Sequence, residues 1–272
     1  MANSELIQGT NNRSFRAALR AVEAMGGTVN LGYAAFRTML RPPYYPELFV
    51  EQCYQLGVKS LSLTTVTALS TGMVMSLQFG LGLERFGGKL YVPKIVGLSI
   101  TRELGPILTC LMIAGRVGSG IAAEIGSMKV TQQVDAIRAL GTDPLKRLVI
   151  PRILAMLVMC PLLTILADLV GIYGGLLLSW GELNIPPEYY FHQSITALRF
   201  GDFMTGVVKT FFFGLIISVT ACWYGLNTTG GTQGVGQATT RAVVTSSILV
   251  VIFDFVLTKL IMVIERSMGV FG

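Results

Sequence analysis

Long apolar runs separated by short polar stretches dominate the chain. Five of these runs reach bilayer length, because about 20 apolar residues are needed to cross about 30 Å of hydrocarbon. They cover residues 60–83, 93–123, 153–180, 203–226 and 242–264. The pattern predicts an all-α integral membrane protein that crosses the bilayer five times.

The segment before the first run is basic and has no continuous apolar core of the kind found in a cleavable signal peptide. Its small and apolar residues recur at helical spacing among arginines, at Ala17, Ala18, Ala21, Val22 and Met25. This spacing favours an amphipathic helix on the membrane surface, with a poorly ordered basic tail as the alternative. We divide the chain into residues 1–58, a cytoplasmic tail with an interfacial helix, and residues 59–272, a five-span domain.

Composition and charge agree with a membrane protein. The chain is 52% hydrophobic and 13% charged, with a mean hydropathy of +0.62, whereas soluble domains carry about 25% charged residues. Its net charge of +6 comes from basic residues that flank the apolar runs, which argues against nucleic-acid binding. They are more numerous on the side of the N-terminal segment and the 124–152 loop. This bias predicts a cytoplasmic N-terminus and a C-terminus on the opposite side.

The residues needed for several kinds of chemistry are missing. Gly88-Lys89 lacks the first glycine and the hydroxyl of a phosphate-binding loop, so ATP hydrolysis is not expected of this chain. Gly118 begins a G-x-G-x-x-A sequence, but inside an apolar run with no preceding strand. The one histidine, His192, and four scattered cysteines offer neither a catalytic triad nor a metal cluster. We predict no catalytic residue, metal ligand or cofactor; an intramembrane hydrolase is a remote alternative.

Several charges lie inside the apolar runs. Arg102 and Glu103 precede Gly105-Pro106, a pair that can kink a helix. A charge at the bilayer centre costs at least about 2.5–3.5 kcal/mol, so each should face protein or a wet cavity and find a partner. Since these neighbours point in different directions, their partners are expected on other helices.

Lys209 and Asp254 are the available partners in other runs. Asp254 lies well inside its run, which favours a functional or inter-helix role. For Lys209 and Lys259 the alternative is that the side chain extends from near a span end to the interface. The sequence assigns no role to Asp168.

Small residues recur in register along the second run. One row contains Ala114, Gly118 and Ala122, and a second contains Gly115 and Ser119, with Arg116 between them. Such faces allow close approach of helix backbones in lipid. They predict a packing or dimer seam, and ordinary packing within one bundle is the alternative.

The loop between the second and third runs contains a short helical pattern. Thr131 can cap a helix carrying Val134, Ile137 and Leu140, which Gly141 ends. This amphipathic helix, within about residues 127–144, can fit a groove in a soluble partner, and a solvated loop is the alternative. Residues 182–202 are predicted to form a short external loop or surface helix.

Eight dispersed motifs carry a family resemblance that covers the chain from about residue 45 onward. In order they are Glu103-Leu-Gly-Pro, Ala114-Gly-Arg-Val-Gly-Ser, Ala123-Glu-Ile-Gly, Asp135-Ala-Ile-Arg-Ala-Leu-Gly-Thr-Asp-Pro, Pro151-Arg, Gly171-Ile-Tyr-Gly-Gly, Gly234-Val-Gly-Gln-Ala-Thr-Thr and Asp254-Phe-Val-Leu-Thr. Together they resemble the MlaE/YrbE permeases of MCE-type ABC lipid transporters.

The resemblance implies a homodimer of five-span subunits in the bacterial inner membrane. Two MlaF-like ATPase subunits, holding ATP and Mg, would bind on the cytoplasmic side, with an MlaB-like STAS-domain protein attached through them. A hexameric MlaD-like MCE ring protein would sit on the periplasmic side. The assembly would move phospholipid between the inner membrane and the MCE protein, for outer-membrane lipid homeostasis.

The resemblance also implies roles for individual residues. Those expected near the lipid pocket or its charged network are Arg102, Glu103, Lys209 and Asp254, and apolar size favours Leu77 and Phe79 for its walls. The helix that couples to the ATPase would use Glu124, Asp135, Arg138, Gly141, Asp143 and Pro144. The helix-packing or dimer seam would contain Gly115, Arg116, Gly118, Ser119 and Ala122.

Two other classes of function fit the same residues. A stand-alone secondary transporter would use Asp254 and Glu103 as proton sites and would work without an ATPase. In a non-transporting scaffold, the charges would serve assembly only. Co-purification with an ATPase whose ATP hydrolysis depends on this chain would separate these three functions.

Overall fold

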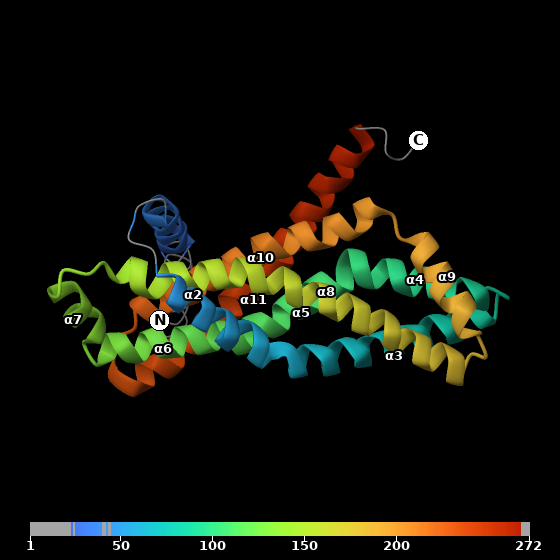
Figure 1. Cartoon of the computed structure of the whole chain (residues 1–272), viewed down its shortest axis with the longest axis horizontal. Coiled ribbons are helices and arrows are strands. Elements are labelled where there is room, and N and C mark those ends of the chain that lie inside the picture. The colour runs from blue at the N-terminus through green and yellow to red at the C-terminus, as the bar shows by residue number, and fades with distance from the viewer. Residues whose placement is uncertain (1–22, 24, 40–41, 43–44, 268–272) are drawn as a thin grey trace, which may run out of the picture.

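The computed structural model describes residues 23, 25–39, 42 and 45–267. Among these residues every regular element is helical, and most helices run along one long axis (Figure 1). Five segments are long and apolar enough to cross a membrane: Pro46–Glu84, Lys89–Val130, Leu145–Gly181, Phe200–Leu226 and Gly231–Ile264. The all-α, five-span prediction is confirmed, and the helices extend beyond the apolar runs into the polar flanks.

The first span joins several helical segments. It contains α2 (Pro46–Gln52), a π-helical turn η1 (Cys53–Gly57), a 3₁₀ turn η2 (Val58–Ser60) and α3 (Leu61–Glu84). The domain boundary predicted between residues 58 and 59 falls inside this continuous span.

A separate helix covers residues 25–39 and lies beside α10 (Phe200–Leu226), where its Gly32 faces Val219. On its other face Met25, Val29 and Tyr33 are exposed. This apolar face suits a helix at the membrane surface. The surface helix predicted around residues 17–25 lies outside the described residues except at residues 23 and 25.

The second span is interrupted twice without breaking. It runs through η3 (Lys89–Tyr91), α4 (Val92–Ser99), the π turn η4 (Ile100–Leu104), α5 (Gly105–Ile113), the π turn η5 (Ala114–Gly118) and α6 (Ser119–Val130). Pro106 has no N–H to continue the normal ladder, and the N–H of Gly105 donates to the carbonyl of Ile100, five residues back. The predicted kink is therefore a widened turn just before Gly105-Pro106.

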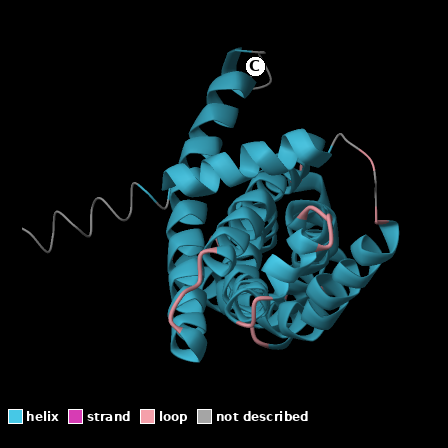
Figure 2. Cartoon of the chain, turned by 90° about the vertical axis from the view of Figure 1, so that its left-hand side faces the viewer, coloured by secondary structure: helices cyan, strands magenta, loops and turns pink. Residues whose placement is uncertain are grey.

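The remaining elements are α7 (Gln133–Ala139), η6 (Leu145–Val149), α8 (Ile150–Gly181), α9 (Pro187–Ala197), α10 and α11 (Gly231–Ser267). The long helix α8 packs chiefly against α3 and α10, and α10 also packs against α6 and α11. α7 and α9 lie at opposite ends of the bundle (Figure 1). Seen from the end that carries α7, the C-terminal part of α11 extends away from the other helices (Figure 2).

The segment predicted as an external loop or surface helix, residues 182–202, contains α9. Tyr190 on α9 is buried, and Ser194 Oγ donates to the Pro93 carbonyl, so α9 is fixed against α4. Burial raises the pKa of Tyr190 to about 12. Its phenol therefore stays neutral at any physiological pH.

The start of α7 differs from the prediction. Thr131 does not cap this helix, because its hydroxyl donates back to the Ser127 carbonyl at the end of α6. The residue before α7 is Gln132, in the left-handed conformation with φ of 59°. The predicted helix end is confirmed: Gly141 follows α7 with φ of +76°, a conformation that glycine adopts without strain.

Candidate functional site

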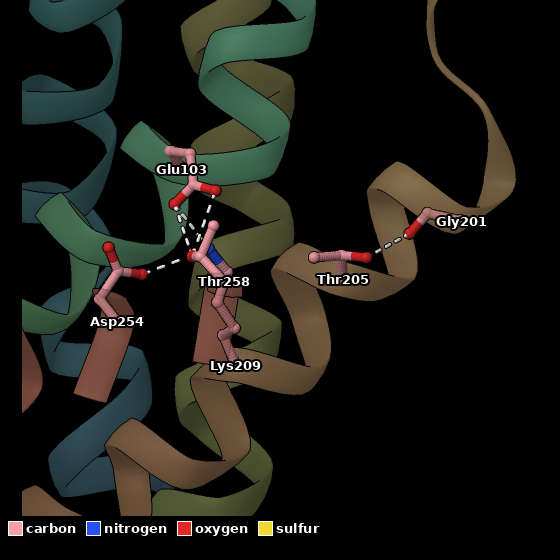
Figure 3. Close-up of polar contacts among 6 residues, drawn as sticks. All are labelled: Glu103, Gly201, Thr205, Lys209, Asp254 and Thr258. Atoms are coloured by element: carbon pink, nitrogen blue, oxygen red, sulfur yellow. Dashed lines mark hydrogen bonds and ion pairs between the residues drawn. The ribbon is translucent and has the colours of Figure 1, made fainter. Parts of the chain in front are cut away.

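A charged network lies inside the spans and joins three of them (Figure 3). The ammonium group of Lys209 on α10 lies 2.6 Å from Glu103 Oε2 on η4 and 3.2 Å from Asp254 Oδ1 on α11. It also donates to the Thr258 hydroxyl at 3.0 Å, and that hydroxyl faces both carboxylate oxygens of Glu103 at 3.4 Å. An ammonium has three donors, so Lys209 is fully hydrogen-bonded.

Local sequence explains how these groups meet. Asp254 and Thr258 are four residues apart on α11 and therefore lie on one face of the helix. Glu103 belongs to the π turn that precedes Pro106, and such a turn shifts side chains relative to a regular helix. The pairing of Lys209 with Glu103 is one that the intramembrane charges predict, whereas the pairing of Lys209 with Asp254 was not predicted.

Exposure within the network is uneven. The side chain of Lys209 is 0% exposed, that of Asp254 15% and that of Glu103 37%. Complete burial with three partners rules out the alternative that Lys209 extends to the interface. One ammonium stands between two carboxylates, so part of the negative charge of Glu103 faces out of the chain at membrane depth. The cost of such a charge in hydrocarbon requires a second protein surface or water there.

Arg102 pairs elsewhere. Its Nη1 lies 3.1 Å from Asp202 Oδ1, in the first turn of α10, and both side chains are largely buried. Asp254, the carboxylate available to Arg102 from the apolar runs, pairs with Lys209 and not with Arg102. The expectation was wrong on this point because Asp202 falls in the stretch predicted as external, whereas α10 already begins at Phe200.

The other residues assigned to the pocket or left without a role are dispersed. Leu77 on α3 is 36% exposed, whereas Phe79 packs against a small buried cluster beside α4 and α9. Asp168 on α8 is buried against Gly105, and its Oδ1 has no hydrogen-bond partner among the described residues. Lys259 on α11 is exposed. The structure brings none of the four into the Lys209 network.

Polar contacts hold the loop that carries α7 and the helix ends beside it. Glu124 on α6 accepts from Arg152 Nη2 of α8 at 2.7 Å, and Lys129 pairs with Asp135 at 3.1 Å. Asp143 Oδ1 accepts from the N–H of Leu145 at the start of η6. Of the remaining residues assigned to coupling, Arg138 and Gly141 are exposed and Pro144 is buried. Their part in coupling stays a prediction.

The predicted amphipathic face of α7 is divided between core and solvent. Val134 is buried, Ile137 is half-buried and Leu140 is 81% exposed. A large apolar side chain with this exposure at the tip of a loop is typical of a docking residue.

The small residues of the second span face two ways. Gly118 lies beside Ile217 and Ser246, and Ala122 is fully buried, so this row packs against α10 and α11 of the same chain. Gly115 and Ser119 are half-exposed. Arg116 donates to the Ser60 hydroxyl of the first span. The structure therefore separates the residues that were predicted as one seam.

Sequence reasoning missed two members of these sites. Thr258 carries no charge and was assigned no role, although it ends the motif Asp254-Phe-Val-Leu-Thr and lies four residues from Asp254. Asp202 follows Arg199 by three residues, and its carboxylate accepts from the Arg199 N–H at 3.1 Å. That spacing is typical of a helix start and could have moved the predicted start of α10 upstream.

Comparisons with known proteins show the family of this chain. The family model Permease MlaE matches residues 49–260. A protein of Rickettsia felis named "Probable ABC transporter permease protein" is 40% identical over 90% of this chain and 95% of its own length. A Synechocystis protein with a similar name is 41% identical over 78% of this chain and 80% of its own.

A third relative is the Arabidopsis thaliana protein TRIGALACTOSYLDIACYLGLYCEROL 1, chloroplastic, which is 38% identical over 77% of this chain and 60% of its own length. The family model covers all five spans except the first residues of one and the last residues of another. This chain belongs to the MlaE family of ABC transporter permeases.

Proposed function

We propose that the chain is the permease subunit of an ATP-driven phospholipid transporter. Two copies form the membrane part, and separate MlaF-like ATPases, with an MlaB-like STAS protein attached, bind ATP and Mg on the cytoplasmic side. The transporter moves phospholipid between the bacterial inner membrane and a periplasmic MlaD-like MCE ring protein. In this orientation α7 lies at the cytoplasmic face and α9 at the periplasmic face.

The observation that carries this proposal is the partly exposed carboxylate of the Lys209 network. Exposing the charged Glu103 carboxylate to lipid would cost several kcal/mol of free energy. The network therefore faces a water-filled cavity or a second copy of the chain. Glu103, Lys209 and Asp254 all lie nearer the α9 ends of their spans. A cleft that closes around this network would hold a polar headgroup beside apolar helix walls.

Two further features support the assembly. The C-terminal half of α11 exposes Phe253, Phe255 and Val256 around the half-buried Asp254. This apolar face next to a charged network suits burial against a second copy of the chain. The name of the Arabidopsis relative includes a diacylglycerol glycolipid, which agrees with a lipid cargo.

Reconstitution tests the proposal. The chain is purified with its ATPase and placed in donor vesicles that contain a labelled phospholipid, and transfer to the MCE protein is followed with and without ATP. We expect transfer that needs ATP and a functional ATPase. Transfer driven by a proton gradient without ATPase would instead support a secondary transporter with carboxylates at 103 and 254. Absence of transfer under both conditions would support a scaffold.

Leu140 gives a sharper test of ATPase docking. We expect Leu140→Asp to lower ATPase co-purification and ATP-dependent transfer by about tenfold, because a buried apolar anchor typically contributes more than 1 kcal/mol to an interface. Stability should not change, since Leu140 is 81% exposed. The matched control is Phe86→Asp, which changes a side chain that is 86% exposed at the opposite end of the bundle. Equal ATPase binding by Leu140→Asp and wild type would contradict docking through α7.

A further inference from the structure

A cavity of about 420 Å³ opens between the first and second spans at the end of the bundle that carries α7. Its apolar lining comes from Leu56, Val117 and Ile121, all of which are buried. Charged side chains, among them Lys59 and Arg116, complete it. We call this cavity the polar groove. Its size is within the range of small-molecule sites, about 300–1,000 Å³.

Irregular helical turns line the polar groove on both sides. The π turn η1 contributes Leu56 and the adjoining 3₁₀ turn contributes Lys59. From the second span, the π turn η5 contributes Arg116 and Val117. Irregular turns of this kind occur frequently at functional sites because they redirect side chains. Here they bring two cations to one opening, far from the Lys209 network near the other end of the spans.

The charges of the groove are not balanced within the described part of the chain. Arg116 donates to the Ser60 hydroxyl, and Lys59 donates to the Gln55 amide oxygen and lies 5.6 Å from the centre of the Tyr54 ring. Neither cation is within ion-pair distance of a carboxylate among the described residues.

Two carboxylates also border the groove, Glu51 and Glu124. Glu124 is held by Arg152 at 2.7 Å, on the side of α8. Two cations are therefore opposed by one uncompensated carboxylate, that of Glu51. A half-buried arginine inside a span normally has an anionic partner, and Arg116 has none among the residues that the structure describes.

We infer that the polar groove binds the phosphodiester group of a phospholipid from the leaflet on the α7 side of the membrane. The guanidinium of Arg116 can bind two phosphate oxygens at once, and Lys59 adds a point charge at the groove's edge. Basic pockets between spans on the cytoplasmic side bind anionic headgroups in this way. The apolar lining accommodates the glycerol backbone and the first methylenes of the acyl chains.

This second lipid site does not depend on the nature of the cargo. It lies in the opposite half of the spans from Glu103 and Lys209, and a lipid can remain bound there whatever the Lys209 network transports. The experiment therefore measures lipid binding and not transfer. Its failure would leave the proposed transport function untouched, and failure of transport would leave this site untouched.

Photocrosslinking tests the inference on the full chain. The protein is placed in nanodiscs of phosphatidylethanolamine and phosphatidylglycerol that contain a trace of a photoactivatable phosphatidylglycerol, and labelled peptides are mapped by mass spectrometry. We expect label on peptides covering residues 51–59 and 116–124. Arg116→Gln should reduce this label by about tenfold, as expected for the loss of a charge-assisted contact to phosphate. Lys59→Gln should reduce it less.

Arg241→Gln is the matched control. Arg241 is an exposed arginine in the N-terminal part of α11, and it does not line the groove. It should leave the label on both peptides unchanged, and a thermal melt of each variant identifies misfolded samples. Unchanged label in a folded Arg116→Gln protein would overturn the inference. Displacement of the lipid by inorganic phosphate alone would also overturn it. A disulfide between two copies of the Gln55→Cys variant would do the same, because it would show that a second chain fills the groove.

Discussion

Replacing Lys209 with methionine is expected to lower the free energy of unfolding by about 3–5 kcal/mol, the range for removal of one partner from a buried ion pair. The side chain is fully buried and donates to Glu103, Asp254 and Thr258. Without the ammonium, two carboxylates face each other inside the spans with no counter-charge. Chemical or thermal unfolding in detergent measures the change, and transfer of labelled lipid measures its effect on function.

Two companion variants separate charge from packing. Lys259→Met alters an exposed lysine on α11 and should change stability little. A variant that combines Lys209→Met with Glu103→Gln and Asp254→Asn removes all three charges, and should recover much of the lost stability because no charge remains unpaired. Transport should stay lost in that variant if the charges serve the cargo. Wild-type stability of Lys209→Met alone would show that the network contributes nothing to the fold.

The network itself was largely predictable from the sequence. Apolar runs locate the spans, and a charge within a span needs a partner, so Glu103, Lys209 and Asp254 could be grouped before any coordinates. Thr258 and Asp202 were assigned no role in it. A hydroxyl in an apolar run costs little to bury and does not stand out in the sequence. Asp202 was placed in the external loop or surface helix predicted over residues 182–202, because Pro186-Pro187 and nearby polar residues obscured where α10 begins.

The polar groove could not be predicted in this way. It depends on π turns in two spans, and a π turn results from hydrogen bonds five residues apart that no periodicity in the sequence marks. Arg116 was therefore grouped with the small residues around it and not with Lys59, which lies in the other span. The same limit applies to Gly118 and Ala122: small-residue spacing predicts close packing, but not which helix lies opposite.

The packing of α3 against α8 is tested most directly by a substitution at Gly72, where the two helix backbones are in close contact. A Cβ at Gly72 would lie 1.8 Å from the carbonyl oxygen of Gly171, and a Cβ at Gly174 would lie 2.4 Å from that of Leu69. These contacts are with backbone, which cannot rotate away as a side chain can. We expect Gly72→Ala to separate the two helices and to lower the free energy of unfolding by about 1–3 kcal/mol, the usual cost of overpacking, with loss of transport.

Two other glycines of α3 provide graded controls for the same substitution. At Gly80 a Cβ would meet the Leu183 side chain at 2.6 Å, and that side chain can change rotamer, so Gly80→Ala should cost less than Gly72→Ala. At Gly82 nothing lies within 4 Å, and alanine there should be neutral or stabilise the helix by up to about 1 kcal/mol. Melting temperatures of the three variants should therefore rise in the order 72, 80, 82. If all three melted together, backbone contact between α3 and α8 would not limit the stability of the bundle.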